Sequence, residues 1–130
     1  MVPHAGYVYS ASVAAYSYAQ LKGLSFDTVV VLGPCHREPV SGAVVPAATK
    51  WRTPLGEVPI DQEFAAALMA AEPRISRSDG PHAEEHCLEV QVPFLQRSLT
   101  NFRLLPVLLS DFSLTNCAAI SPWLYPAYSP

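Results

Sequence analysis

The stretch FDTVVVLGPCH, residues 26–36, gives the clearest indication of the fold class. Its three valines and one leucine follow one another without polar alternation, which is typical of a strand buried on both faces. A Gly-Pro pair then ends the run, and Cys35 and His36 come directly after it. We therefore expect a strand over residues 26–34 that delivers two chemically reactive side chains at its carboxyl end.

Outward from this strand, apolar runs alternate with helical patterns. FRLLPVLLS (102–110) is a second continuous apolar run, and GAVVPA (42–47) is a shorter one. Strands interleaved with helices predict an α/β layered fold with a central, mostly parallel or mixed sheet flanked by helices. The predicted helices cover residues 10–21, 62–71, 87–99 and 111–124, with Ser10 or Ser12, Asp61, and Asp111 or Ser113 as capping residues and Pro93 disturbing the third helix. The predicted loops cover residues 50–61 and 76–86.

Composition excludes several classes of function. A chain of 130 residues is expected to form a single domain. With a net charge of −3 it has no basic surplus for nucleic acid, and no apolar run reaches the ~18–20 residues that a membrane span needs. The first residues lack the pattern of a secretory signal peptide, so a cytoplasmic location is expected. The three cysteines are widely spaced, which favours reduced thiols over disulfides or a zinc knuckle.

Two histidines occupy matching positions near the starts of loops. His4 lies in VPHAGY, directly after Pro3, and His36 lies in LGPCHRE, two residues after Pro34. If the two preceding segments are parallel neighbours, both imidazoles reach the same edge of the sheet, where α/β proteins bind ligands. Two fixed neutral imidazoles would begin a divalent-metal site that needs a further ligand. The alternative is that each is a loop histidine bonded to the backbone.

The segment HAEEHCLEVQ (82–91) holds the other two histidines in an H-x-x-x-H spacing. On a helix this spacing would place His82 and His86 on one face, although the HExxH pattern of zinc hydrolases is absent. One interpretation is a helix start with Glu84 and Glu85 near its N-terminal partial charge. The other makes His86 a general acid or base, with Glu85 or Glu89 orienting its second nitrogen.

Four further residues are candidates for lining a cleft. Cys35 is either a thiolate ligand or nucleophile, or a small packed thiol. Tyr7 and Tyr9 either line a pocket or pack at the start of the first helix. Thr53 belongs to a rim loop or to a simple turn shaped by the proline that follows it.

Five blocks together resemble the Memo-like family, also called AmmeMemoRadiSam system protein B. The resemblance covers residues 1 to about 124, and the blocks are VPHAGYVYS, VVLGPCH, RTPLGEVPID, EEHCLEVQVPFLQ and LLPVLLSD. It implies an α/β fold similar to that of the class III extradiol dioxygenases, which are non-heme iron enzymes. It also implies a redox metal, iron or copper, bound by His4, His36 and a cysteine from a later segment, with His86 facing the metal in the cleft.

The resemblance also implies that this chain is a partial domain, with an incomplete sheet. The family strand before VPHAGY, the later SSDFSHYG-like block and the ligand cysteine are not found in residues 1–130. Metal binding by the chain alone is therefore expected to be weak or absent. Cys35 and Cys87 stand where the family usually has serine.

Three functional hypotheses are consistent with the sequence. The first is a metal-dependent, dioxygenase-like oxidoreductase, and the second is a module that binds a peptide or small molecule without catalysis. The third is a partial reading frame with no stable fold of its own. The family name also associates such proteins with radical-SAM and AMMECR-type partners.

Overall fold

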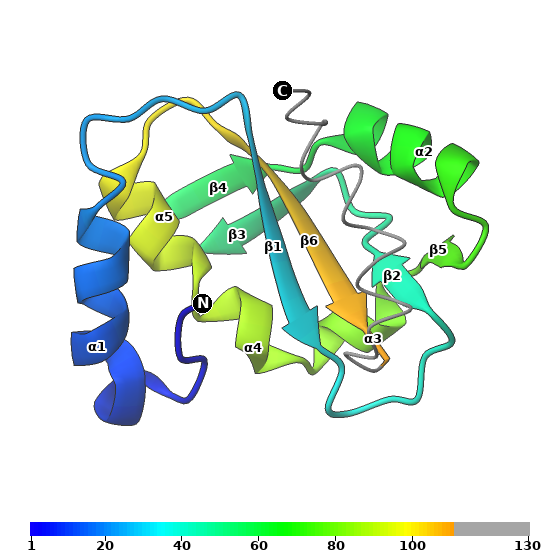
Figure 1. The fold of residues 1–130 in the computed structure, drawn as a ribbon, viewed down its shortest axis with the longest axis horizontal. Helices are drawn as coiled ribbons and strands as arrows, with labels where there is room; N and C mark the ends of the chain where they lie inside the picture. The colour runs from blue at the N-terminus through cyan, green and yellow to red at the C-terminus, as the bar shows by residue number, and fades with distance from the viewer. Residues whose placement is uncertain (111–130) are drawn as a thin grey trace, which may run out of the picture.

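The computed structural model describes residues 1–110, so the helix expected over residues 111–124 lies outside the described part. A four-stranded sheet has the order β1–β6–β2–β5 (Figure 1). Strand β6 is parallel to β1 and antiparallel to β2, and β2 is parallel to β5. These strands are β1 (Thr28–Pro34), β2 (Ala43–Val45), β5 (Ile75–Arg77) and β6 (Arg103–Leu109). The predicted α/β fold with a mixed sheet is confirmed.

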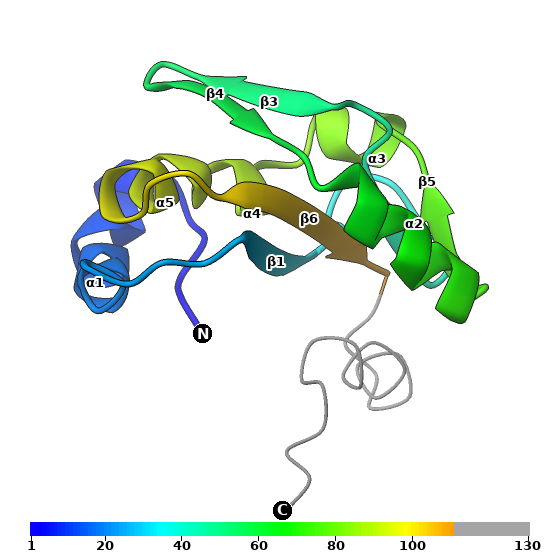
Figure 2. The ribbon, with the colours of Figure 1, turned by 90° about the horizontal axis from the view of Figure 1, so that it is seen from above.

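Helices cover both faces of this sheet. Helix α2 lies over one face, whereas α1, α4, α5 and a separate β3–β4 hairpin lie on the other (Figure 2). The bounds are α1 (Tyr7–Ala19), β3 (Lys50–Thr53), β4 (Gly56–Pro59), α2 (Gln62–Ala71), α3 (Gly80–Ala83), α4 (His86–Glu89) and α5 (Val92–Ser98). None of the helices in residues 1–110 is long and apolar enough to span a bilayer.

Strand β6 is the centre of the core, as its apolar sequence predicts. Every residue from Leu104 to Leu109 is buried. Leu105 and Val107 face α2, and Leu104 faces the cluster that includes α1 and α5. Because side chains alternate along a strand, one apolar run serves both halves of the core.

The expectation that the first strand is buried on both faces is wrong. Most of β1 is only half-buried, and Leu32 is 39% exposed. The strand lies at the edge of the sheet, with β6 as its neighbour among the described residues. Its valines alone cannot show this position, since burial depends on how many neighbours the strand has.

Four other expectations about elements also need correction. The predicted loop 50–61 contains the β3–β4 hairpin. The predicted loop 76–86 contains α3 and the end of the short strand β5. The single helix over 87–99 is two helices, because Pro93 lies in the first turn of α5, where its missing N–H costs no hydrogen bond. The first helix begins at Tyr7 with Gly6 as its N-cap, not at a serine cap.

The prediction for α2 is confirmed. The Asp61 side chain accepts a hydrogen bond from the Phe64 N–H at 3.0 Å and so caps the helix. Arg103 lies 3.2 Å from the same carboxylate, which ties the start of α2 to the start of β6.

Candidate functional site

Three of the four histidines meet at the carboxyl end of β1. His4 comes from the segment before α1, His36 follows β1, and His86 begins α4. The ring centroids of His4 and His36 are 5.4 Å apart, and those of His36 and His86 are 6.0 Å apart. His4 precedes His36 by 32 residues, and His86 follows it by 50 residues. The three rings nevertheless form one imidazole cluster.

Short contacts at the end of β1 fix the position of His36. The Cys35 N–H donates to the Leu109 carbonyl at 2.9 Å, which extends the β1–β6 pairing by one residue. The Cys35 thiol donates to the Glu38 carbonyl at 3.0 Å, so it is held within its own turn. The next residue, His36, then projects from the sheet edge with a side chain that is 42% exposed.

Glu85 is the buried anchor of the cluster. Its side chain is 1% exposed, and its carboxylate accepts the His36 backbone N–H at 2.6 Å. The same carboxylate lies 3.1 Å from His36 Nδ1 and also accepts the Cys87 N–H at 3.1 Å, where it caps α4. With Nδ1 engaged, Nε2 is the His36 atom that remains for a ligand.

The electrostatics of Glu85 favour its charged form. Burial acts to raise the pKa of this carboxyl, but the hydrogen bonds from the His36 and Cys87 backbone N–H groups outweigh it and hold the pKa at about 2. Glu85 therefore carries a negative charge at neutral pH. Its oxygen is 3.6 Å from His86 Nδ1, so it lies nearer to His36 than to the histidine it was expected to orient.

Cys87 packs in the core, where it is 2% exposed, and it also lies beside this cluster. Ligand atoms of His36, Glu85 and Cys87 lie within 4.8 Å of one another, so the described residues contain a group able to hold a metal ion. The chemistry of the thiol disfavours Cys87 itself as a ligand. Burial, reinforced by the neighbouring Glu85 charge, raises its pKa to about 12, and its Sγ donates to the Pro34 carbonyl at 3.1 Å. A protonated thiol is a poor metal ligand.

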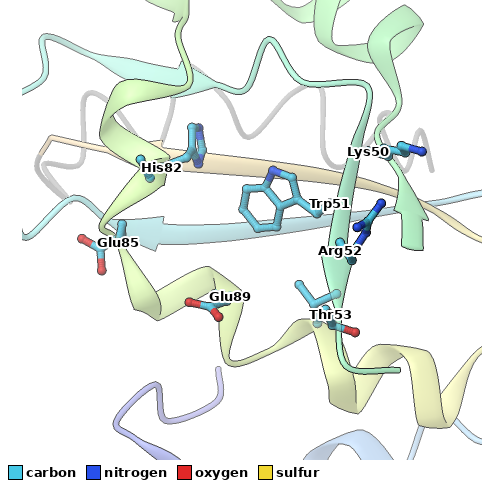
Figure 3. Close-up of a pocket in the computed structure, with 9 residues that line it drawn as sticks. Lys50, Trp51, Arg52, Thr53, His82, Glu85 and Glu89 are labelled. Carbon is cyan, nitrogen blue, oxygen red and sulfur yellow. The ribbon is translucent and has the colours of Figure 1, made fainter. Parts of the chain in front are cut away.

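His82 is separated from the other histidines. It belongs to α3, whereas His86 begins α4, so the two do not share a helix face. Its ring packs edge-on against Trp51 at 5.7 Å, as Figure 3 shows. Burial lowers the pKa of His82, although the nearby Val44 backbone acts to raise it. Neither ring nitrogen makes a hydrogen bond of ordinary geometry within the described residues. His82 is thus a neutral packed side chain.

A cavity of about 340 Å³ lies between the β3–β4 hairpin and α3–α4. Its lining includes Trp51, Thr53 and Glu89. Lys50 and Arg52 also line it, but their side chains point away from Trp51 (Figure 3). Thr53 is also part of the hairpin turn, where its hydroxyl donates to Gln96 Oε1 at 2.6 Å. Thr53 therefore lies both at a cavity wall and in a turn, as the two interpretations of the sequence proposed.

Tyr7 and Tyr9 lie on the first turn of α1. Tyr7 is 48% exposed, and its ring contacts Phe94 edge-on at 5.9 Å. Partial burial, followed by the Glu89 charge, raises its pKa. Tyr9 is 84% exposed. Of the two, Tyr7 is the one that packs against a neighbouring helix.

A larger apolar groove of about 1120 Å³ starts at His4 and runs along β1. Its walls come from the N-terminal segment, α1 and the exposed side of β1, and include Val2, Leu21 and Val30. Gln91, a buried residue at the junction of α4 and α5, also lines it. Sequence reasoning missed Gln91, although an uncharged polar residue between Val90 and Val92 in an apolar helical stretch is a usable signal.

Comparison with known proteins gives a consistent result. The family model described as Memo-like protein matches residues 1–126. Similar curated proteins include a MEMO1 family protein of Methanobrevibacter smithii, 39% identical over 116 residues, which are 88% of this chain and 41% of that protein. Another is from Sulfolobus acidocaldarius, 43% identical over 112 residues, which are 84% of this chain and 39% of that protein. The chain spans about two fifths of the length of these relatives.

Proposed function

The chain belongs to the Memo-like protein family, and from this premise we propose that its imidazole cluster is part of a redox-metal site, for iron or copper, used in dioxygenase-type chemistry. The observation that carries the proposal is the convergence of His4 and His36, with ring centroids 5.4 Å apart. Glu85 adds to it, because a carboxylate on the second nitrogen of a metal-binding histidine fixes its tautomer and orientation.

The donor set fits such a metal. Imidazole nitrogens bind iron and copper well, and His36 offers Nε2 because Nδ1 is engaged by Glu85. His4 and His36 would hold the ion, which when bound supplies a Lewis acid and a redox centre with open positions. The low pKa of Glu85 keeps a negative charge behind His36, which strengthens the ring as a ligand.

His86 has a separate role in this proposal. Its side chain is 46% exposed and its Nδ1 faces Glu85, so Nε2 is the atom that meets a substrate. An imidazole at this place can take a proton from a substrate hydroxyl and return it later. Glu85 is then a positioning residue shared by two histidines and does not itself transfer the proton.

Anaerobic titration of the purified chain with Fe(II) tests the proposal. Two imidazoles hold a divalent ion only weakly, so we expect modest affinity in the wild type and a loss of about tenfold or more in His4→Ala and His36→Ala. His82→Gln is the matched control, because His82 lies outside the cluster and should leave binding unchanged. Equal binding by the wild type and by both cluster variants would overturn the proposal.

The apolar groove along β1 favours a second candidate function, the binding of an extended peptide without catalysis. An edge strand with half-buried valines can pair with a peptide backbone and accept alternate side chains. A labelled peptide of alternating apolar and polar residues should then bind equally well with and without a metal chelator. Leu32→Asp should weaken that binding, and the absence of any binding by the wild type would remove this candidate.

A further inference from the structure

Two buried polar side chains donate hydrogen bonds to the backbone on either side of His4. Gln91 Nε2 donates to the Pro3 carbonyl at 3.2 Å, and the Ser10 hydroxyl donates to the Ala5 carbonyl at 2.8 Å. Gln91 is 3% exposed and Ser10 is 7% exposed. Most polar groups buried in a core form such bonds, because leaving them without a partner is costly, so we expect both contacts to stabilise the folded chain.

The amide of Gln91 has one orientation that satisfies its neighbours. Its Nε2 faces two carbonyls, Pro3 at 3.2 Å and Cys87 at 3.4 Å, and a carbonyl can only accept a hydrogen bond. Its Oε1 accepts the Tyr18 hydroxyl at 2.7 Å. A flipped amide would place its oxygen against both carbonyls, so the three contacts fix the side chain.

These contacts join three parts of the chain at one residue. Pro3 precedes His4, Cys87 follows His86, and Tyr18 belongs to α1. The Pro3 carbonyl is part of the planar peptide that ends at the His4 Cα, so holding that carbonyl fixes the place of the His4 N and Cα and limits where the imidazole can lie. Gln91 is 88 residues from Pro3, and the segment before α1 contains no helix or strand that would hold it otherwise.

We propose that Gln91 is a positioning residue that holds the His4 imidazole against His36 for metal binding, with the Tyr18 hydroxyl locking its amide and Ser10 as the second support. This inference rests on the proposed function, since the place of the His4 ring matters through the ion that it would bind. Preorganised ligands bind more tightly because less conformational freedom is lost when the ion enters.

The test compares Gln91→Leu with Gln62→Leu in the full 130-residue chain. Gln62 is a matched control, because its Nε2 also donates to two backbone carbonyls, Pro46 and Ala48, but at the start of α2. Co²⁺ binding is measured by visible absorption, and thermal melts of both variants record the loss of stability. We expect Gln91→Leu to lower Co²⁺ affinity about 10- to 100-fold, Tyr18→Phe to lower it less, and Gln62→Leu to leave it unchanged.

A second measurement needs no metal. In the metal-free wild type, nuclear Overhauser effects should connect the His4 and His36 ring protons, whose centroids are 5.4 Å apart. We expect them to disappear in Gln91→Leu and to persist in Gln62→Leu. Persistence in Gln91→Leu, or an unchanged Co²⁺ affinity, would overturn the inference. The proposed function is overturned separately, by equal Fe(II) binding in the wild type and in the His4 and His36 variants, and in that case the ring contacts still decide whether Gln91 positions His4.

Discussion

At the scale of single residues, one carboxylate organises the cluster. Glu85 accepts backbone N–H groups from His36 and Cys87 and also faces two imidazoles. A buried charge is tolerated only when it is paired and hydrogen-bonded, and here each carboxylate oxygen has a donor. The charge that supports His36 is therefore also part of what holds α4 to the end of β1.

Glu85→Gln should weaken both the fold and the site. One carboxylate oxygen becomes an NH2 group, which faces an N–H donor, so we expect a loss of about 1.5–3 kcal/mol in the free energy of unfolding. Metal affinity should fall about 10- to 100-fold. Urea denaturation and Fe(II) titration measure the two effects. Glu72→Gln, which removes a carboxyl with a similarly low pKa paired to Arg74, should leave metal affinity unchanged.

The same residue predicts a pH dependence. The pKa of Glu85 in the folded protein, about 2, lies below its ordinary value of 4.5. Its contribution to stability is thus complete above about pH 4.5 and is lost as the pH falls towards 2. Between these values the wild type should lose more stability than Glu85→Gln does. Parallel losses in the two proteins would show that Glu85 does not carry this effect.

Cys87 should behave as an inert thiol. Its pKa of about 12 leaves almost no thiolate at pH 8, and the residue is 2% exposed. In a Cys117→Ser background, iodoacetamide should modify Cys35, which is partly exposed, well before Cys87. Peptide mass spectrometry over time measures the order. Equal rates would instead indicate a thiolate at Cys87 and would restore it as a candidate ligand.

At the scale of elements, close packing of α4 on β1 brings His86 to His36. Gly33 makes this approach possible, because a Cβ there would lie 2.6 Å from Leu88 Cδ2 and 2.7 Å from Cys87 Sγ. Leu88 and Cys87 are both 2% exposed and have little room to move. The glycine is therefore needed for the helix contact, since the β1 backbone itself adopts no unusual conformation at this position.

Gly33→Ala should push α4 away from β1. Overpacking of this kind typically costs about 1–3 kcal/mol, and we expect that loss in the free energy of unfolding together with altered NMR signals from His36 and His86. The control is Gly80→Ala, where the nearest atom is Ser78 Oγ at 3.7 Å and an added methyl meets only ordinary contact. A Gly33→Ala protein as stable as that control would contradict the proposed contact.

At the scale of the whole molecule, β6 connects the halves of the core. Leu104 belongs to the cluster with α1 and α5, whereas Leu105, Val107 and Leu109 belong to the cluster with α2. The histidine cluster lies at the carboxyl ends of β1 and β6, which is where parallel strands of α/β proteins place ligand sites. Loss of β6 would remove both the core and the base of the site.

Because both clusters share β6, the described part of the chain should unfold cooperatively. Thermal unfolding followed by far-UV circular dichroism and by near-UV aromatic signals should give coincident, sigmoidal transitions. This outcome would also exclude the hypothesis of a chain without a stable fold. A gradual loss of signal, or separate transitions from the two probes, would contradict a shared core.

Elements with local sequence signals were predictable without the fold. The apolar run of β6 and the Asp61 cap of α2 are short-range patterns, and the structure contains both features. The prolines near His4 and His36 also predicted that the two imidazoles meet at one edge of the sheet, and their ring centroids are 5.4 Å apart, although residues 1–6 form no strand. The Memo-like blocks are also local in sequence, and the family match over residues 1–126 agrees with them.

Contacts between residues far apart in sequence could be seen in the three-dimensional structure but not in the sequence. In the structure β1 lies at an edge of the sheet and β3 pairs with β4. The Glu85 carboxylate lies closer to His36 Nδ1, at 3.1 Å, than to His86 Nδ1, at 3.6 Å. The fold also brings Gln91 to the carbonyl before His4, 88 residues away. Such contacts depend on the packing of whole elements, and hydrogen bonds between distant groups form only after that packing has fixed their positions.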